Sequence, residues 1–155
     1  MRLTVYTDYA LRVLMYLAVH PDLKPTIGQI AGAYGISRNH LMKVAYELGV
    51  AGFIETARGN RGGLRLKLPP AEIGLAEVIR HTETDFELVP CFAVDGTDCC
   101  AIRPACGLRG ALHKARAAFM AVLDRYTLAD LVVNRDALST LLSGPLALPP
   151  PPRVA

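Results

Sequence analysis

The chain opens with apolar side chains that recur at the three- and four-residue spacing of amphipathic helices. Thr7 can cap a helix expected from Asp8 to His20. Thr26 and Gln29 have the spacing of a capping box, so a second, shorter helix is expected to follow and to stop at Gly35.

A third helix is expected from Arg38 to Leu48, with Ser37 as its cap and Gly49 as its stop. Only the tight turn 34–37 separates it from the second helix. Two short helices joined in this way have the spacing of a helix-turn-helix, whose second helix enters the DNA major groove.

Two strands are expected next, at 53–57 and 63–68, with the glycine-rich basic turn 58–62 between them. A hairpin after a helix-turn-helix is a wing. A helix is then expected from Leu75 to Thr82, and a much longer one from Pro104 over nearly six turns. The long helix carries one apolar seam, which requires a partner: Leu108, Leu112, Ala115, Phe119, Val122 and Tyr126.

These elements predict a mainly α protein with a small β-wing: a winged helix-turn-helix with a long C-terminal dimerisation helix. We expect a DNA-binding domain over 1–80 and a cysteine loop over 81–107. A dimerisation helix and a short helix opened by Thr127 should occupy 104–135. The proline-rich remainder, 136–155, is expected to be a disordered tail.

Composition places the chain among globular proteins, because 52% of its 155 residues are hydrophobic and 20% are charged. Charged residues interrupt every apolar stretch before it reaches the roughly 18 residues of a membrane span, and the N-terminus does not have the pattern of a signal peptide. We therefore expect a cytoplasmic protein with no membrane partner, in which thiols stay reduced.

The net charge of +3 is unevenly distributed, since the segment 36–68 is basic and the segment 83–100 is acidic. The basic part contains the side chains that can reach bases or phosphates of double-stranded operator DNA. An alternative is a winged-helix module that binds protein. The candidate DNA-binding residues are Ser37, Arg38, Asn39, His40 and Lys43 on the helix and Arg58, Asn60 and Arg61 on the wing.

All four cysteines lie in one stretch: Cys91, Cys99, Cys100 and Cys106. Their spacing is wider than the close pairs of structural zinc sites and suits an iron-sulfur cluster better, so zinc is the second choice. Cys99 and Cys100 are adjacent and diverge too much to bind one cluster comfortably. The sequence leaves open which of the two is a ligand, and a fourth ligand must come from elsewhere.

Four segments, with the sequences LTVYTDYALR, YGISRNHLMK, RGNRGGLRL and YTLADL, resemble the NsrR family of nitric-oxide-sensing repressors. The resemblance covers residues 1 to about 135, and the third segment is shared with related regulators such as IscR. It implies a homodimer with one cluster per subunit, ligated by Cys91, Cys100 and Cys106. An IscR-like histidine ligand is excluded because Arg109 occupies its position, and the resemblance implies Asp8 of the partner subunit instead.

The resemblance further implies a repressor that binds operator DNA with its cluster, expected as 4Fe-4S with 2Fe-2S as the alternative. Nitric oxide is the expected effector, which releases the dimer by nitrosylating the cluster. Alternatives are an iron-sulfur homeostasis or redox regulator of the same fold, a zinc-stabilised regulator and a small electron-transfer protein. Neither His81 nor His113 has a discernible catalytic partner, so we expect no enzyme.

Overall fold

The computed structural model describes residues 2–57, 62–92 and 100–143. Its first helix, α1, spans Val5–Val19 and is capped by Thr4, whose hydroxyl accepts a hydrogen bond from the Thr7 amide. The prediction that Thr7 caps this helix is therefore wrong. Thr7 lies within the first turn and is fully buried, and its hydroxyl donates to that of Thr82 on another helix at 2.9 Å.

The next two helices form the predicted helix-turn-helix. Helix α2, Ile27–Tyr34, begins with a capping box between Thr26 and Gln29 and ends at Gly35, whose φ of 64° is the left-handed conformation that glycine adopts readily. Helix α3, Arg38–Val50, runs two residues past the predicted end at Leu48, so Gly49 lies inside it.

The wing is a two-stranded antiparallel sheet of β1, Ile54–Ala57, and β2, Gly63–Leu66, paired from Ile54 opposite Leu66 to Ala57 opposite Gly63. Both strands are slightly shorter than predicted. The amide of Leu64 donates to the carbonyl of Pro25 at 2.9 Å, which holds the wing against the loop before α2.

A short 3-10 turn, η1 (Pro70–Glu72), leads to α4, Leu75–Thr82, which has the predicted bounds. The chain then leaves the winged helix as the cysteine segment, 83–106, of which 93–99 lie outside the described residues. This segment contains the 3-10 turns η2, Pro90–Phe92, and η3, Arg103–Ala105.

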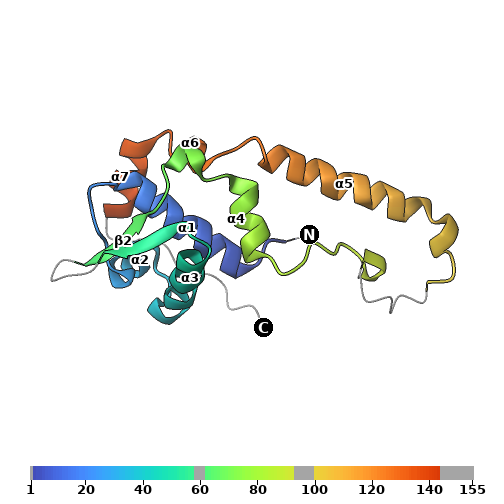
Figure 1. The fold of residues 1–155 in the computed structure, drawn as a ribbon, viewed down its shortest axis with the longest axis horizontal. Coiled ribbons are helices and arrows are strands. Elements are labelled where there is room, and N and C mark those ends of the chain that lie inside the picture. The colour runs from blue at the N-terminus through green and yellow to red at the C-terminus, as the bar shows by residue number, and fades with distance from the viewer. Residues whose placement is uncertain (1, 58–61, 93–99, 144–155) are drawn as a thin grey trace.

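Helix α5, Gly107–Leu123, is shorter than predicted at both ends, because the chain around Pro104 forms η3 and Cys106 is the N-cap. It extends away from the winged helix, as Figure 1 shows, and residues 83–92 run below it in that view. No residue of α5, which is described over its whole length, is buried. The predicted need for a partner is consistent with this exposure.

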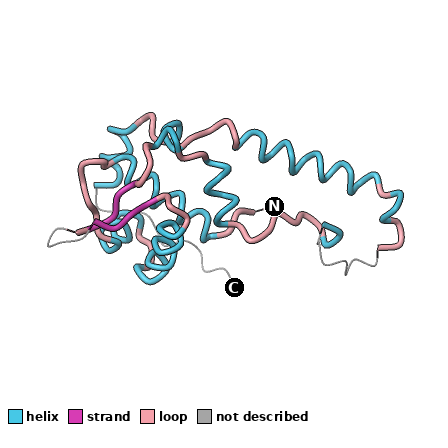
Figure 2. Tube along the Cα trace, viewed as in Figure 1, coloured by secondary structure: helices cyan, strands magenta, loops and turns pink. Residues whose placement is uncertain are grey.

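The chain then returns to the winged helix. Helix α6, Leu128–Leu131, has a capping box between Thr127 and Asp130, and the buried Leu128 joins the core of α1, α2 and α3. Helix α7, Arg135–Ser143, packs on α1 and α2, so the predicted disordered tail does not begin at 136, and its remainder, 144–155, lies outside the described residues. Figure 2 shows that helices dominate the described chain.

Among the described residues, no helix combines the length and the apolar character that crossing a membrane requires.

Candidate DNA-binding surface and metal ligands

The first turns of α3 present the predicted DNA-binding side chains to solvent. Its opposite face is fixed in the core by Leu41, Val44 and Leu48, each at most 2% exposed. Ser37 is the N-cap but its side chain makes no capping hydrogen bond, so the helix does not hold the hydroxyl in place. The exposed polar set is Ser37, Arg38, Asn39, His40 and Lys43.

Helix α1 supports this surface from behind. The ring of Tyr9 stacks on that of His40, with centroids 6.4 Å apart and planes 30° apart. Met42 and Tyr46 are also exposed on α3, at 44% and 69%. Tyr9, Met42 and Tyr46 were not among the residues predicted for this surface. For Met42 and Tyr46 the signal was their four-residue spacing on the helix face beside Lys43, whereas the Tyr9 contact had none.

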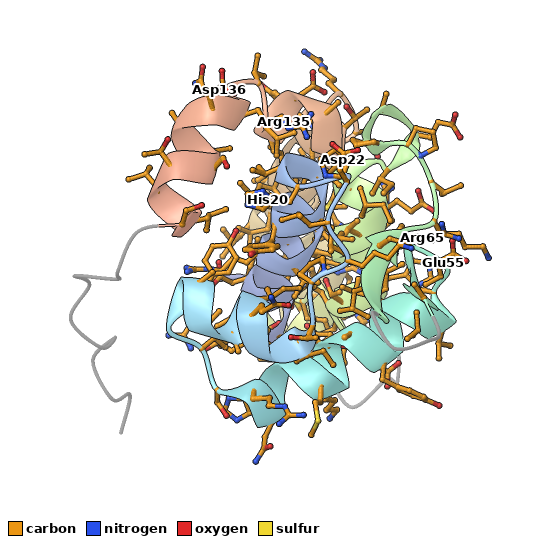
Figure 3. The ribbon with its side chains drawn as sticks, turned by 90° about the vertical axis from the view of Figure 1, so that its left-hand side faces the viewer. His20, Asp22, Glu55, Arg65, Arg135 and Asp136 are labelled. Atoms are coloured by element: carbon orange, nitrogen blue, oxygen red, sulfur yellow. The ribbon has the colours of Figure 1, made fainter. Side chains whose placement is uncertain are left out.

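The wing residues Arg58, Asn60 and Arg61 lie outside the described residues, so their role stays a prediction. On the strands, Arg65 pairs with Glu55 at 2.8 Å, and the two lie directly opposite each other in the sheet. Figure 3 shows this pair at the edge of the wing. Because Glu55 balances it, Arg65 contributes less to the basic surface than the sequence suggests.

Asp8, the predicted ligand from the partner subunit, lies in the first turn of α1 and pairs within its own chain with Arg12, Nε to Oδ2 at 2.9 Å. Both side chains are roughly half exposed, so the carboxylate stays accessible. The Arg12 guanidinium also lies 5.7 Å from the centre of the Tyr34 ring. Burial raises the pKa of Tyr34 to about 12, and the nearby Arg12 charge opposes that rise.

The start of α1 is tied to the start of the cysteine segment. Glu83 accepts hydrogen bonds from the Thr4 amide at 2.7 Å and from the Thr4 hydroxyl at 3.1 Å. One turn deeper, Thr7 donates to Thr82, whose hydroxyl donates to the carbonyl of Val78 at 3.0 Å. The element with Asp8 and the segment with the cysteines are therefore mechanically joined in one subunit.

The three predicted cysteine ligands stand in different surroundings. Cys91 is half-buried in the middle of η2, Cys106 is half-buried at the N-cap of α5, and Cys100 is exposed. Cys99 lies outside the described residues, so the choice between Cys99 and Cys100 stays a prediction. Within the described parts of the chain, no three histidine, cysteine, aspartate or glutamate side chains form a group that could hold a metal ion.

The chemistry of the donors still fits an iron-sulfur cluster better than a hard cation. Thiolates are the usual ligands of such clusters, and an exposed carboxylate is available on α1. Among the described residues, Asp8 and the cysteines do not form a group of three or more that could hold a metal ion.

Comparison with known proteins identifies the family. A model of the Rrf2 family, described as an iron-dependent transcriptional regulator, matches residues 3–134. The HTH-type transcriptional regulators NsrR of Shouchella clausii and of Bacillus subtilis are each 51% identical over 143 residues. The match covers 92% of this chain and 95% and 97% of theirs.

Two solved structures share the fold. CymR, the global cysteine regulator of B. subtilis, superposes with a TM-score of 0.70 at 26% identity, covering 86% of this chain and 98% of CymR. IscR of T. potens superposes with a TM-score of 0.68 at 25% identity, covering 88% of each chain. The relatives are named as regulators, which agrees with the expectation that the protein is not an enzyme. The chain therefore belongs to the Rrf2 family of winged-helix transcriptional regulators, within which it is similar to the NsrR proteins.

Proposed function

We propose that the protein is a nitric-oxide-responsive repressor that binds operator DNA as a cluster-containing homodimer. The observation that carries the DNA-binding part is the start of α3, where five polar or basic side chains are exposed on a helix fixed in the core by its other face. The response to nitric oxide rests on the similarity to the NsrR regulators.

Cys91, Cys100 and Cys106 are the proposed cysteine ligands, with Asp8 of the partner subunit as the fourth ligand of a 4Fe-4S cluster. When bound, the cluster supplies iron that reacts with nitric oxide. A carboxylate is a harder and less covalent donor than a thiolate, so Asp8 should hold the iron that is most open to a small ligand.

Asp8 also provides a structural connection between the proposed cluster and the DNA-binding helix α3. If Asp8 binds the partner's cluster, it leaves or shares its ion pair with Arg12, which lies over Tyr34 at the end of α2. Tyr34 directly precedes the turn into α3. A ligand changes an equilibrium only by binding two states differently, so this contact gives cluster binding a means of favouring one placement of the recognition helices.

An anaerobic absorption spectrum before and after addition of nitric oxide tests the proposal, combined with DNA-binding measurements on the same samples. The untreated dimer should be coloured and bind a two-fold symmetric operator, and nitric oxide should change the spectrum and release the DNA. Serine at Cys91, Cys100 or Cys106 should give a colourless, folded dimer, whereas Cys99→Ser should stay coloured. A colourless wild type that holds stoichiometric zinc would contradict the proposal.

The second candidate function is a regulator of iron-sulfur homeostasis or redox state, which the structural similarity to T. potens IscR favours. The same experiment separates the two. Under this alternative the coloured protein loses DNA binding after oxidation or iron depletion, and stoichiometric nitric oxide in the absence of oxygen leaves it on the DNA.

A further inference from the structure

Phe92 is the only buried residue among the described positions of the cysteine segment, at 8% exposure. Its ring lies against α5, where it stacks on His113 with centroids 4.1 Å apart and planes 24° apart. The guanidinium carbon of Arg116 lies 5.1 Å from the centre of the same ring. His113 and Arg116 are three residues apart, so they face the segment from the same side of the helix.

Phe92 is also the last residue of the turn that contains Cys91. The turn η2 is closed by a hydrogen bond from the Phe92 amide to the Val89 carbonyl at 3.0 Å. Cys91 therefore lies inside the turn that this hydrogen bond closes, next to a residue whose ring packs on α5. The neighbouring Phe92 is thus the residue through which Cys91 is connected to α5.

Helix α5 thus supports two of the candidate ligands. Cys106 is its N-cap, and His113 lies seven residues further along, or about 10 Å at 1.5 Å per residue. The Phe92 ring therefore ties the turn that contains Cys91 to the helix that Cys106 caps.

We propose that Phe92 is a positioning residue that clamps Cys91 against α5 and so sets the geometry of the cysteine ligands. This inference rests on the proposed function, because it assumes that Cys91 and Cys106 bind one cluster. The clamp combines a ring stack with a cation over the ring face, and both contacts lose their geometry when the aromatic ring is removed.

The test compares Phe92→Ala, Phe92→Leu and Phe92→Tyr in the full-length protein. The alanine variant should lose its cluster to a chelator faster than wild type and show an altered visible spectrum, while tyrosine, which keeps the ring, should restore both. Leucine keeps apolar volume without the stack, so it is informative even if the alanine variant folds poorly. Phe86→Ala is the control for packing beside α5, because Phe86 lines the same hollow as His113 and Arg116 but lies five residues before Cys91 and outside its turn.

A second readout needs no cluster. In the cluster-free protein the rate of iodoacetamide modification of each cysteine is followed by mass spectrometry. Loss of the clamp should accelerate modification of the half-buried Cys91 by about tenfold and leave Cys106, which α5 itself fixes, nearly unchanged.

The possible results separate this inference from the proposed function. If wild type binds a cluster and the alanine and leucine variants match it in cluster lability and Cys91 modification, the clamp is refuted and the proposed function stands. If wild type takes up no cluster at all, the proposed function fails. The modification rates alone then decide whether Phe92 positions Cys91.

Discussion

His20 shows how a single residue at the end of α1 makes the fold sensitive to pH. Its ring packs on Tyr16 with centroids 4.8 Å apart. Arg135 of α7 lies at the same helix end, where its Nε donates to the carbonyl of Val19 at 2.7 Å, and Figure 3 shows His20 and Arg135 close together. Burial, and after it the Arg135 charge, lower the pKa of His20.

A lowered histidine pKa means that the folded state disfavours the proton which the unfolded chain accepts. The His20 ring is neutral in the folded and in the unfolded state above the unfolded pKa of about 6.5, so stability should fall as the pH drops below that pKa. Urea unfolding at about pH 7.5 and pH 5.5 should show this loss, and His20→Gln should reduce it. A His20→Gln protein with the same pH dependence as wild type would contradict the assignment.

Thr7 is the buried polar residue of α1, and its hydroxyl donates a hydrogen bond to Thr82 and lies 3.2 Å from the Thr4 hydroxyl. Thr7→Val keeps the shape and removes the hydroxyl, so we expect a loss of about 1 kcal/mol in the free energy of unfolding. Thr7→Ser keeps the donor and is the control for the hydroxyl. Denaturant unfolding measures both, and a Thr7→Val protein as stable as wild type would contradict the role of the hydroxyl.

At the scale of elements, periodicity and turn chemistry predicted most of the fold. The capping box of α2 and the bounds of α4 were correct because their signals are local. The start of α1 was misplaced because Thr4 and Thr7 are both suitable caps, and only Thr82, distant in sequence, decides between them. Helix α7 was missed because its stability comes from packing on α1 and α2, which a nine-residue sequence does not reveal.

The base of the wing depends on a glycine. A Cβ at Gly63 would collide with the Lys24 carbonyl and lie 2.8 Å from the Pro25 carbonyl oxygen, both backbone atoms that cannot move independently. Gly63→Ala should therefore displace β2 and cost on the order of 2 kcal/mol or more, with weaker operator binding. Gly49→Ala is the control, because that helical glycine has open space around its Cβ and the change should be neutral or slightly stabilising. Thermal unfolding and DNA titration of both variants provide the measurement.

At the scale of the whole molecule, the winged helix has a buried core of its own, whereas α5 has no buried residue. The core joins α1, α2, α3 and the returning α6, and the exposure of the candidate DNA-binding residues on α3 could be predicted because it depends on helix position alone. The ligand set could not be derived from spacing, because Asp8 lies on α1, more than 80 residues before the first cysteine, and no local pattern connects the two. Only the family resemblance suggested that a second copy joins them.

The apolar seam of α5 is the surface that should join the two copies. Leu108 and Val122 are 65% and 50% exposed, which is unfavourable for an isolated chain in water. Val122→Asp should place a charge in the interface and give a folded monomer, seen as unchanged helical circular dichroism and a halved mass in sedimentation. A monomer binds one half-site, so operator affinity should fall by about a hundredfold or more as avidity is lost. Val133→Asp is the matched control, because Val133 is 76% exposed but lies outside α5, and this variant should stay dimeric. A dimeric Val122→Asp protein with normal operator binding would place the interface elsewhere on the molecule.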